Sequence, residues 1–133
     1  MTEHRIQRDG KAPLVFAGEA IASGDSRGRE SQANRWHELT VYRTEGGQWV
    51  TEIHYRTQWQ GELNRHTAEV LESPEAVRQA LECYDPRADV VGFPPIAVYT
   101  EKQGRLLADV ERRFRALVGD MLSRIPGMEE RIA

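Results

Sequence analysis

The side chains best suited to contact another molecule are concentrated in residues 35–59. This stretch contains all three tryptophans of the chain, together with tyrosine, histidine and arginine side chains. Trp, Tyr and Arg are the residue types that most often dominate the binding energy of protein–protein interfaces. Exposed aromatic rings and arginines also stack on bases and hold phosphates. The stretch therefore predicts a binding surface, and it is consistent with two classes of partner.

The first interpretation is a small non-enzymatic interaction or accessory protein. It would bind a protein partner or associate with itself, because a surface of mixed charge with aromatic anchors suits a protein contact. Two arginines in the preceding loop would become ordered on binding. The predicted contact residues are Trp36, Tyr42, Arg56 and Trp59, with Arg27 and Arg29 in that loop.

The alternative is a nucleic-acid-binding module that uses the same hairpin. The net charge of −3 and the sequence pI of about 5.8 argue against binding through a general excess of positive charge. This composition still allows a local basic face, although the carboxylates of Glu38 and Glu52 would repel a phosphate backbone. The further contacts predicted for this alternative are Arg43, His54, Arg112, Arg113 and Arg115.

The sequence offers no catalytic or metal-binding motif in a suitable setting. Residues 24–28 read Gly-Asp-Ser-Arg-Gly, which matches Gly-x-Ser-x-Gly by residue type, but they lie in a predicted loop with no helix after it and lack the lysine of a phosphate loop. The single cysteine of the chain, Cys83, cannot form an intrachain disulfide or a thiolate metal cluster. A metal or acid–base site at His37, His54 and Glu52 is the least favoured hypothesis, because it needs a different strand register from the one we prefer. We therefore expect no catalytic residue, no metal and no cofactor.

A long β-hairpin positions these side chains. A three-residue turn at residues 45–47, with Gly47 in the left-handed region, would place one apolar set on a single buried face. That set is Leu39, Val41, Trp49, Ile53 and Tyr55, and His37 shares its face. The other face would carry Trp36, Glu38, Thr40, Tyr42, Val50, Glu52, His54, Arg56 and Gln58.

The segments around the hairpin complete an α+β fold. Residues 14–22 and 64–72 read as further strands, and Gly18 in the first of them indicates a bulge or a close backbone approach. Ser73 and Pro74 begin a short helix. Thr100 and Gln103 form a capping box that begins a long helix ending near residue 125. The prediction is a four-stranded antiparallel β-meander followed by two helices packed on one face (ββββαα), the last helix long.

The domain prediction is a flexible N-terminal arm at residues 1–12, one α+β domain at 13–126 and a C-terminal tail at 127–133. No apolar run approaches the length that spans a bilayer, and the charged start lacks the apolar stretch of a signal peptide. We therefore expect a cytoplasmic protein with no membrane contact. The apolar stripe of the long helix is expected to overhang the sheet, which would favour a homodimer or a larger assembly.

Overall fold

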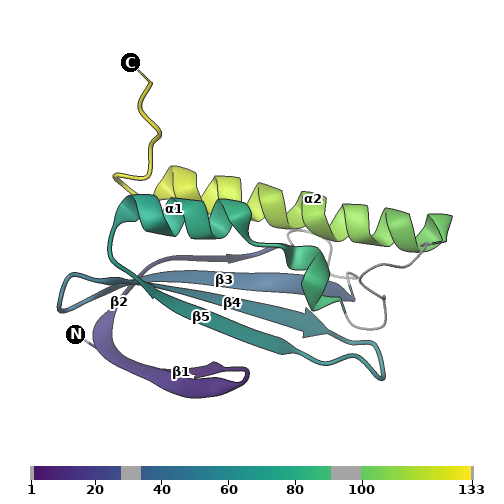
Figure 1. The fold of residues 1–133 in the computed structure, drawn as a ribbon, viewed down its shortest axis with the longest axis horizontal. Coiled ribbons are helices and arrows are strands. Elements are labelled where there is room, and N and C mark those ends of the chain that lie inside the picture. Colours follow the sequence, from purple (N-terminus) through teal and green to yellow (C-terminus); the bar gives the residue numbers. More distant parts are fainter. Residues whose placement is uncertain (1, 28–33, 91–99, 133) are drawn as a thin grey trace.

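The computed structural model of the protein describes residues 2–27, 34–90 and 100–132. These residues form one five-stranded antiparallel sheet in the order β1-β2-β3-β4-β5, two α-helices and one 3-10 helix (Figure 1). The bounds are β1 (Thr2–Arg8), β2 (Lys11–Asp25), β3 (Arg35–Thr44), β4 (Trp49–Thr57), β5 (Arg65–Leu71), α1 (Pro74–Cys83), η1 (Pro86–Asp89) and α2 (Glu101–Arg124).

The predicted α+β class with an antiparallel sheet and a long last helix is confirmed, but the predicted number of four strands is wrong. The fifth strand is β1, which lies inside the segment expected to be a flexible arm. Ile6 is the one apolar side chain of β1 that is fully buried, and its neighbours in the strand are polar. A strand with one apolar anchor has too weak an alternation to be recognised by pattern.

The sheet has a layer on each side. Both helices lie on one face, while β1 and the first half of β2 curl beneath the other (Figure 1). Gly18 marks the bend, because it pairs with Thr2 of β1 and also with Thr44 of β3. A Cβ atom at Gly18 would stand 2.5 Å from the carbonyl oxygen of Arg43. The close backbone approach predicted for this glycine is therefore confirmed, and a separate register shift follows between Ala20 and Ala22.

Replacing Gly18 with alanine is expected to lower the free energy of unfolding by about 1–3 kcal/mol, because the added methyl group would meet backbone that cannot rotate away. Gly119→Ala is the matched control. Nothing lies within 4 Å of a Cβ at that exposed helical position, so the substitution should stabilise by about 1 kcal/mol. Urea denaturation of both variants checks the opposite signs, and equal stability of Gly18→Ala and the wild type would contradict the close approach.

The hairpin has the register that we preferred. Leu39 pairs with Ile53, His37 pairs with Tyr55, and Gly47 has a φ of 85°. The turn is closed by the N–H of Gly47, which donates to the carbonyl of Thr44, and by the N–H of Thr44, which donates to the carbonyl of Gln48. The predicted division of side chains between the two faces is thereby confirmed.

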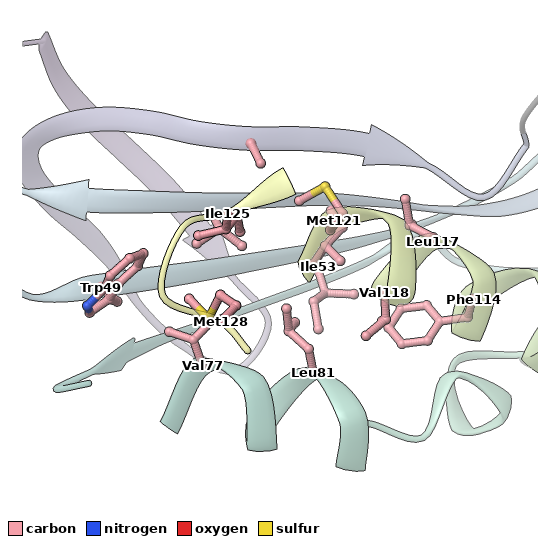
Figure 2. Close-up of a cluster of buried hydrophobic side chains, with 13 residues drawn as sticks. Trp49, Ile53, Val77, Leu81, Phe114, Leu117, Val118, Met121, Ile125 and Met128 are labelled. Atoms are coloured by element: carbon pink, nitrogen blue, oxygen red, sulfur yellow. The ribbon is translucent and has the colours of Figure 1, made fainter. Parts of the chain in front are cut away.

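The larger core lies between the sheet and the two helices (Figure 2). Ser73 caps α1, and the capping box of Thr100 and Gln103 begins α2, both as expected. The expected overhang of α2 is wrong, because its apolar stripe is buried within the chain from Leu107 to Met121. One end of the stripe packs with Tyr55 and Val90, and the rest joins the larger core. The helix therefore gives no reason to expect a dimer.

A second, smaller core lies on the opposite face of the sheet. Tyr42, Val50 and Ala68 are buried there together with Ile6, and Leu14 and Phe16 pack against them. This core exists because the β1–β2 hairpin covers part of the sheet face that carries Tyr42 and Val50. None of the described helices is long and apolar enough to cross a membrane.

Candidate binding surface at the end of the sheet

Several predicted contact residues meet where β3 begins. The guanidinium of Arg27 lies over the ring of Trp36, 4.4 Å from its centroid, and Trp36 is paired across the hairpin with Arg56. Glu38 accepts hydrogen bonds from the Arg56 Nε at 2.9 Å and from the Trp36 indole N–H at 3.3 Å. Partial burial alone would raise the pKa of Glu38, but these two donors lower it overall. The carboxylate therefore holds Trp36 and Arg56 in place.

Trp59 lies just beyond β4, in a loop of residues 58–64 that we call the Trp59 loop. The guanidinium of Arg35 is 5.2 Å from the centroid of its ring. Glu62 accepts hydrogen bonds from Arg35 Nε at 3.0 Å, from Thr57 Oγ1 at 3.0 Å and from the Tyr55 hydroxyl at 3.2 Å. These bonds outweigh burial and lower the pKa of Glu62. The loop is thus fastened to the sheet at several points.

Although it is fastened, this loop exposes two large apolar side chains. Trp59 is 51% exposed and Leu63 is 64% exposed, whereas Trp49 lies in the core. Trp36 and Arg35 are neighbours in β3 and so point to opposite faces of the sheet. The Arg27–Trp36 stack and the Arg35–Trp59 stack therefore lie on opposite faces of the sheet, at the same end. Only the Arg27–Trp36 stack lies on the hairpin face that we predicted to bind a partner.

Tyr42 does not belong to this surface. It is 9% exposed, its ring packs against Phe16 and His4, and its hydroxyl donates to Glu52 at 2.8 Å. Burial and the Glu52 carboxylate raise the pKa of Tyr42 to about 12. Tyr42 was predicted as a contact residue, but the β1–β2 hairpin covers it. Arg29 lies outside the described residues.

The residues predicted for nucleic-acid contact are spread over the molecule and engaged in internal contacts. Arg43 lies over the Trp49 ring at 4.5 Å, beside the hairpin turn. On α2, Arg112 and Arg113 both hydrogen bond to Asp109 and lower its pKa against the opposing effect of burial. The structure does not bring these side chains to one surface with His54.

Arg115 has a local structural role. Its guanidinium donates to the carbonyls of Leu81 and Glu82, at 3.2 and 2.8 Å, and to that of Tyr84. These carbonyls belong to the end of α1, where a helix leaves its acceptors without intrahelical partners. Arg115 therefore joins α2 to α1, and this bond network accounts for its position.

A group of cations that the sequence did not single out lies at the tip of the β1–β2 hairpin. Arg5, Arg8 and Lys11, with Gln7 and Pro13, line a shallow hollow of about 520 Å³. Three cations neutralise about three phosphates, fewer than the roughly 6–10 typical of salt-sensitive nucleic-acid binding. This hollow therefore gives little support to the nucleic-acid alternative.

The histidines fall on two faces, as the preferred register predicted. His37 is 1% exposed, and its Nε2 donates to Asp89 Oδ2 at 2.8 Å. The same carboxylate oxygen accepts from the hydroxyl of Tyr84 at 2.7 Å. This buried network fastens η1 to β3. Asp89 lies in a connector 52 residues from His37, and no local pattern in the sequence could have paired them.

His54 and His66 form a cross-strand pair on the other face, and their Nε2 atoms are 3.2 Å apart. Burial, His66 and Arg56 lower the pKa of His54, while Glu38 and Glu52 oppose them. His37 is on the opposite face, so the predicted trio of His37, His54 and Glu52 does not assemble. Within the described part of the chain, no three His, Cys, Asp or Glu side chains are placed to hold one metal ion.

Comparison of the chain with protein-family models, with curated proteins and with solved structures returned no match. The arrangement of the side chains is therefore the basis for assigning a function.

Proposed function

We propose that this protein is a non-enzymatic interaction module that binds another protein chain through the Trp59 loop and the adjoining Arg–Trp stacks. The observation that carries the proposal is the state of Trp59. Its ring is half exposed, yet Arg35 stacks on it and the loop that bears it is fastened by Glu62. An exposed aromatic ring whose position is already fixed is a typical anchor at a protein–protein interface.

The fastening of the loop favours binding energetically. Ordering a mobile side chain or loop at an interface costs free energy, and a contact that is already ordered avoids part of that cost. Leu63 supplies a second exposed apolar side chain in the same loop. Trp59 and Leu63 together offer a partner an apolar centre, with Arg35 beside it.

The charge of the surface supports a protein partner over a nucleic acid. Two of the arginines at this end are matched by carboxylates, with Arg56 paired to Glu38 and Arg35 paired to Glu62. A surface of both signs suits a polar rim around an apolar contact, whereas a phosphate backbone needs an excess of cations. We place this binding in the cytoplasm, where reducing conditions suit an exposed free thiol such as Cys83.

Photo-crosslinking tests the proposal. Benzoylphenylalanine is introduced at Leu63 and, as a control, at the exposed Ala116 on α2. Both full-length proteins are irradiated after purification and inside the cells that produce them. We expect a covalent product at position 63 and none at position 116. A product of twice the chain mass would identify a second copy, and another discrete mass would identify a different protein.

Two results would contradict the proposal. One is the absence of any product at position 63 in both settings. The other is an equal pattern at both positions, which would mean nonspecific collision. Binding of labelled RNA or DNA that weakens steeply with salt would instead favour the nucleic-acid alternative.

A further inference from the structure

The pair of His54 and His66 has the geometry of two ligands of one metal ion. Their Nε2 atoms are 3.2 Å apart and their ring planes are inclined at 52°. Imidazole nitrogens bind zinc at about 2.0–2.1 Å in tetrahedral geometry, which places two such nitrogens about 3.3 Å from each other. The spacing in the protein therefore needs almost no adjustment to admit a zinc ion beside both nitrogens.

We propose that His54 and His66 form a cross-strand binding site for a divalent zinc ion, with water completing the coordination. This inference does not depend on the proposed protein-binding function. The site supplies two protein ligands, one from β4 and one from β5, which is consistent with the lack of a three-ligand group among the described residues. Imidazole nitrogen is a preferred ligand of zinc.

The surroundings of His54 orient it for this role. The Oε1 atom of Glu38 lies 3.6 Å from the Nδ1 atom of His54. A carboxylate behind the ring favours the proton on Nδ1, and it leaves the Nε2 lone pair free for a metal. The hydrogen bond from Arg56 to Glu38 keeps that carboxylate in position.

The backbone of His66 is fixed by the β1–β2 turn. Its N–H donates to Asp9 Oδ2 at 2.9 Å, and its carbonyl accepts from the N–H of Asp9 at 2.9 Å. The backbone of this proposed ligand is thereby bonded on the side of β5 that faces away from β4. The carboxylates of Glu38 and Glu52 act on His54 and favour a cation there, and the charge of Arg56 is offset by its pairing with Glu38.

The competing explanation is a simple hydrogen bond, in which one imidazole donates its Nε2–H to the Nε2 of the other. Calorimetric titration of the tag-free protein with zinc chloride near pH 7.5 distinguishes a zinc site from a hydrogen bond that binds no metal. We expect one ion to bind per chain, and we expect His54→Gln and His66→Gln each to weaken binding by about tenfold or more. His4→Gln is the matched control, because His4 packs beside Tyr42 and Phe16 and lies outside the pair, and this variant should bind zinc as the wild type does.

The nitrogen resonances of the histidine rings give a second readout that needs no substitution. Zinc should shift the signals of His54 and His66 in the wild-type protein and leave those of the buried His37 unchanged. The proposal is overturned if the wild type takes up no zinc at millimolar concentration. It is also overturned if zinc binds without shifting either ring, or if both glutamine variants bind as tightly as the wild type.

Discussion

Replacement of Asp89 with alanine is expected to lower the free energy of unfolding by about 3–5 kcal/mol. The Asp89 carboxylate accepts hydrogen bonds from His37 and Tyr84 in the interior. Without it, a buried imidazole N–H and a buried hydroxyl lose their acceptor, and each such loss costs about 1–3 kcal/mol. Urea denaturation followed by circular dichroism measures the change through the shift of the midpoint at constant slope.

Asp120→Ala is the matched control for this substitution. Asp120 is exposed on α2 and pairs there with Arg124, and exposed pairs of this kind contribute about 0–1 kcal/mol. Asp89→Asn keeps one oxygen acceptor and should lose less stability than Asp89→Ala. If Asp89→Ala were as stable as Asp120→Ala, the network of Asp89, His37 and Tyr84 would have no role in fastening η1 to β3.

The second large effect is expected for Phe114→Ala. Phe114 is 0% exposed in the larger core, and its ring centroid lies 5.0 Å from that of His37 and 5.3 Å from that of Tyr84. Its removal leaves a cavity where the sheet, α1 and α2 meet, and such truncations cost about 3–5 kcal/mol. Thermal unfolding and urea denaturation should both show the loss.

Phe16→Ala makes the same truncation in the smaller core. Phe16 is only partly buried there, beside His4 and Tyr42, so its loss should cost about 1–2 kcal/mol. An equal cost at the two positions would mean that the layer beneath the sheet contributes as much to stability as the layer that carries the helices.

The central features of the fold follow from local chemistry. The hairpin register depends on a left-handed Gly47 and on the burial of one apolar face, and both signals lie within the hairpin itself. The helix starts depend on Ser73 and on the capping box of Thr100 with Gln103, which are equally local. Signals of this kind can be read without knowledge of the rest of the chain.

The features that escaped prediction depend on distant parts of the chain. β1 becomes a strand because β2 curls at Gly18 and places Ile6 over the sheet. The same curl covers Tyr42, which its own strand would leave open. The contact of His37 with Asp89 and that of His54 with His66 join segments whose proximity is set by the topology.

Part of the proposed binding surface was nevertheless foreseeable. Trp36 and Arg56 were predicted from residue type and strand alternation, and Arg27 from its place in the preceding loop; the structure places the three together. Arg35 and Glu62, which fasten Trp59, were not predicted as its supports, because they come from opposite sides of the hairpin and lie 27 residues apart.

The measurement that tests the proposed function most directly is the yield of crosslinked product from benzoylphenylalanine at position 63, compared between the chain with Trp59 and the same chain with Trp59→Ser. If Trp59 is the anchor, its loss should reduce the yield by about tenfold or more. The circular dichroism spectrum should be unchanged, because the Trp59 ring is half exposed. An undiminished yield in the Trp59→Ser protein would contradict the account.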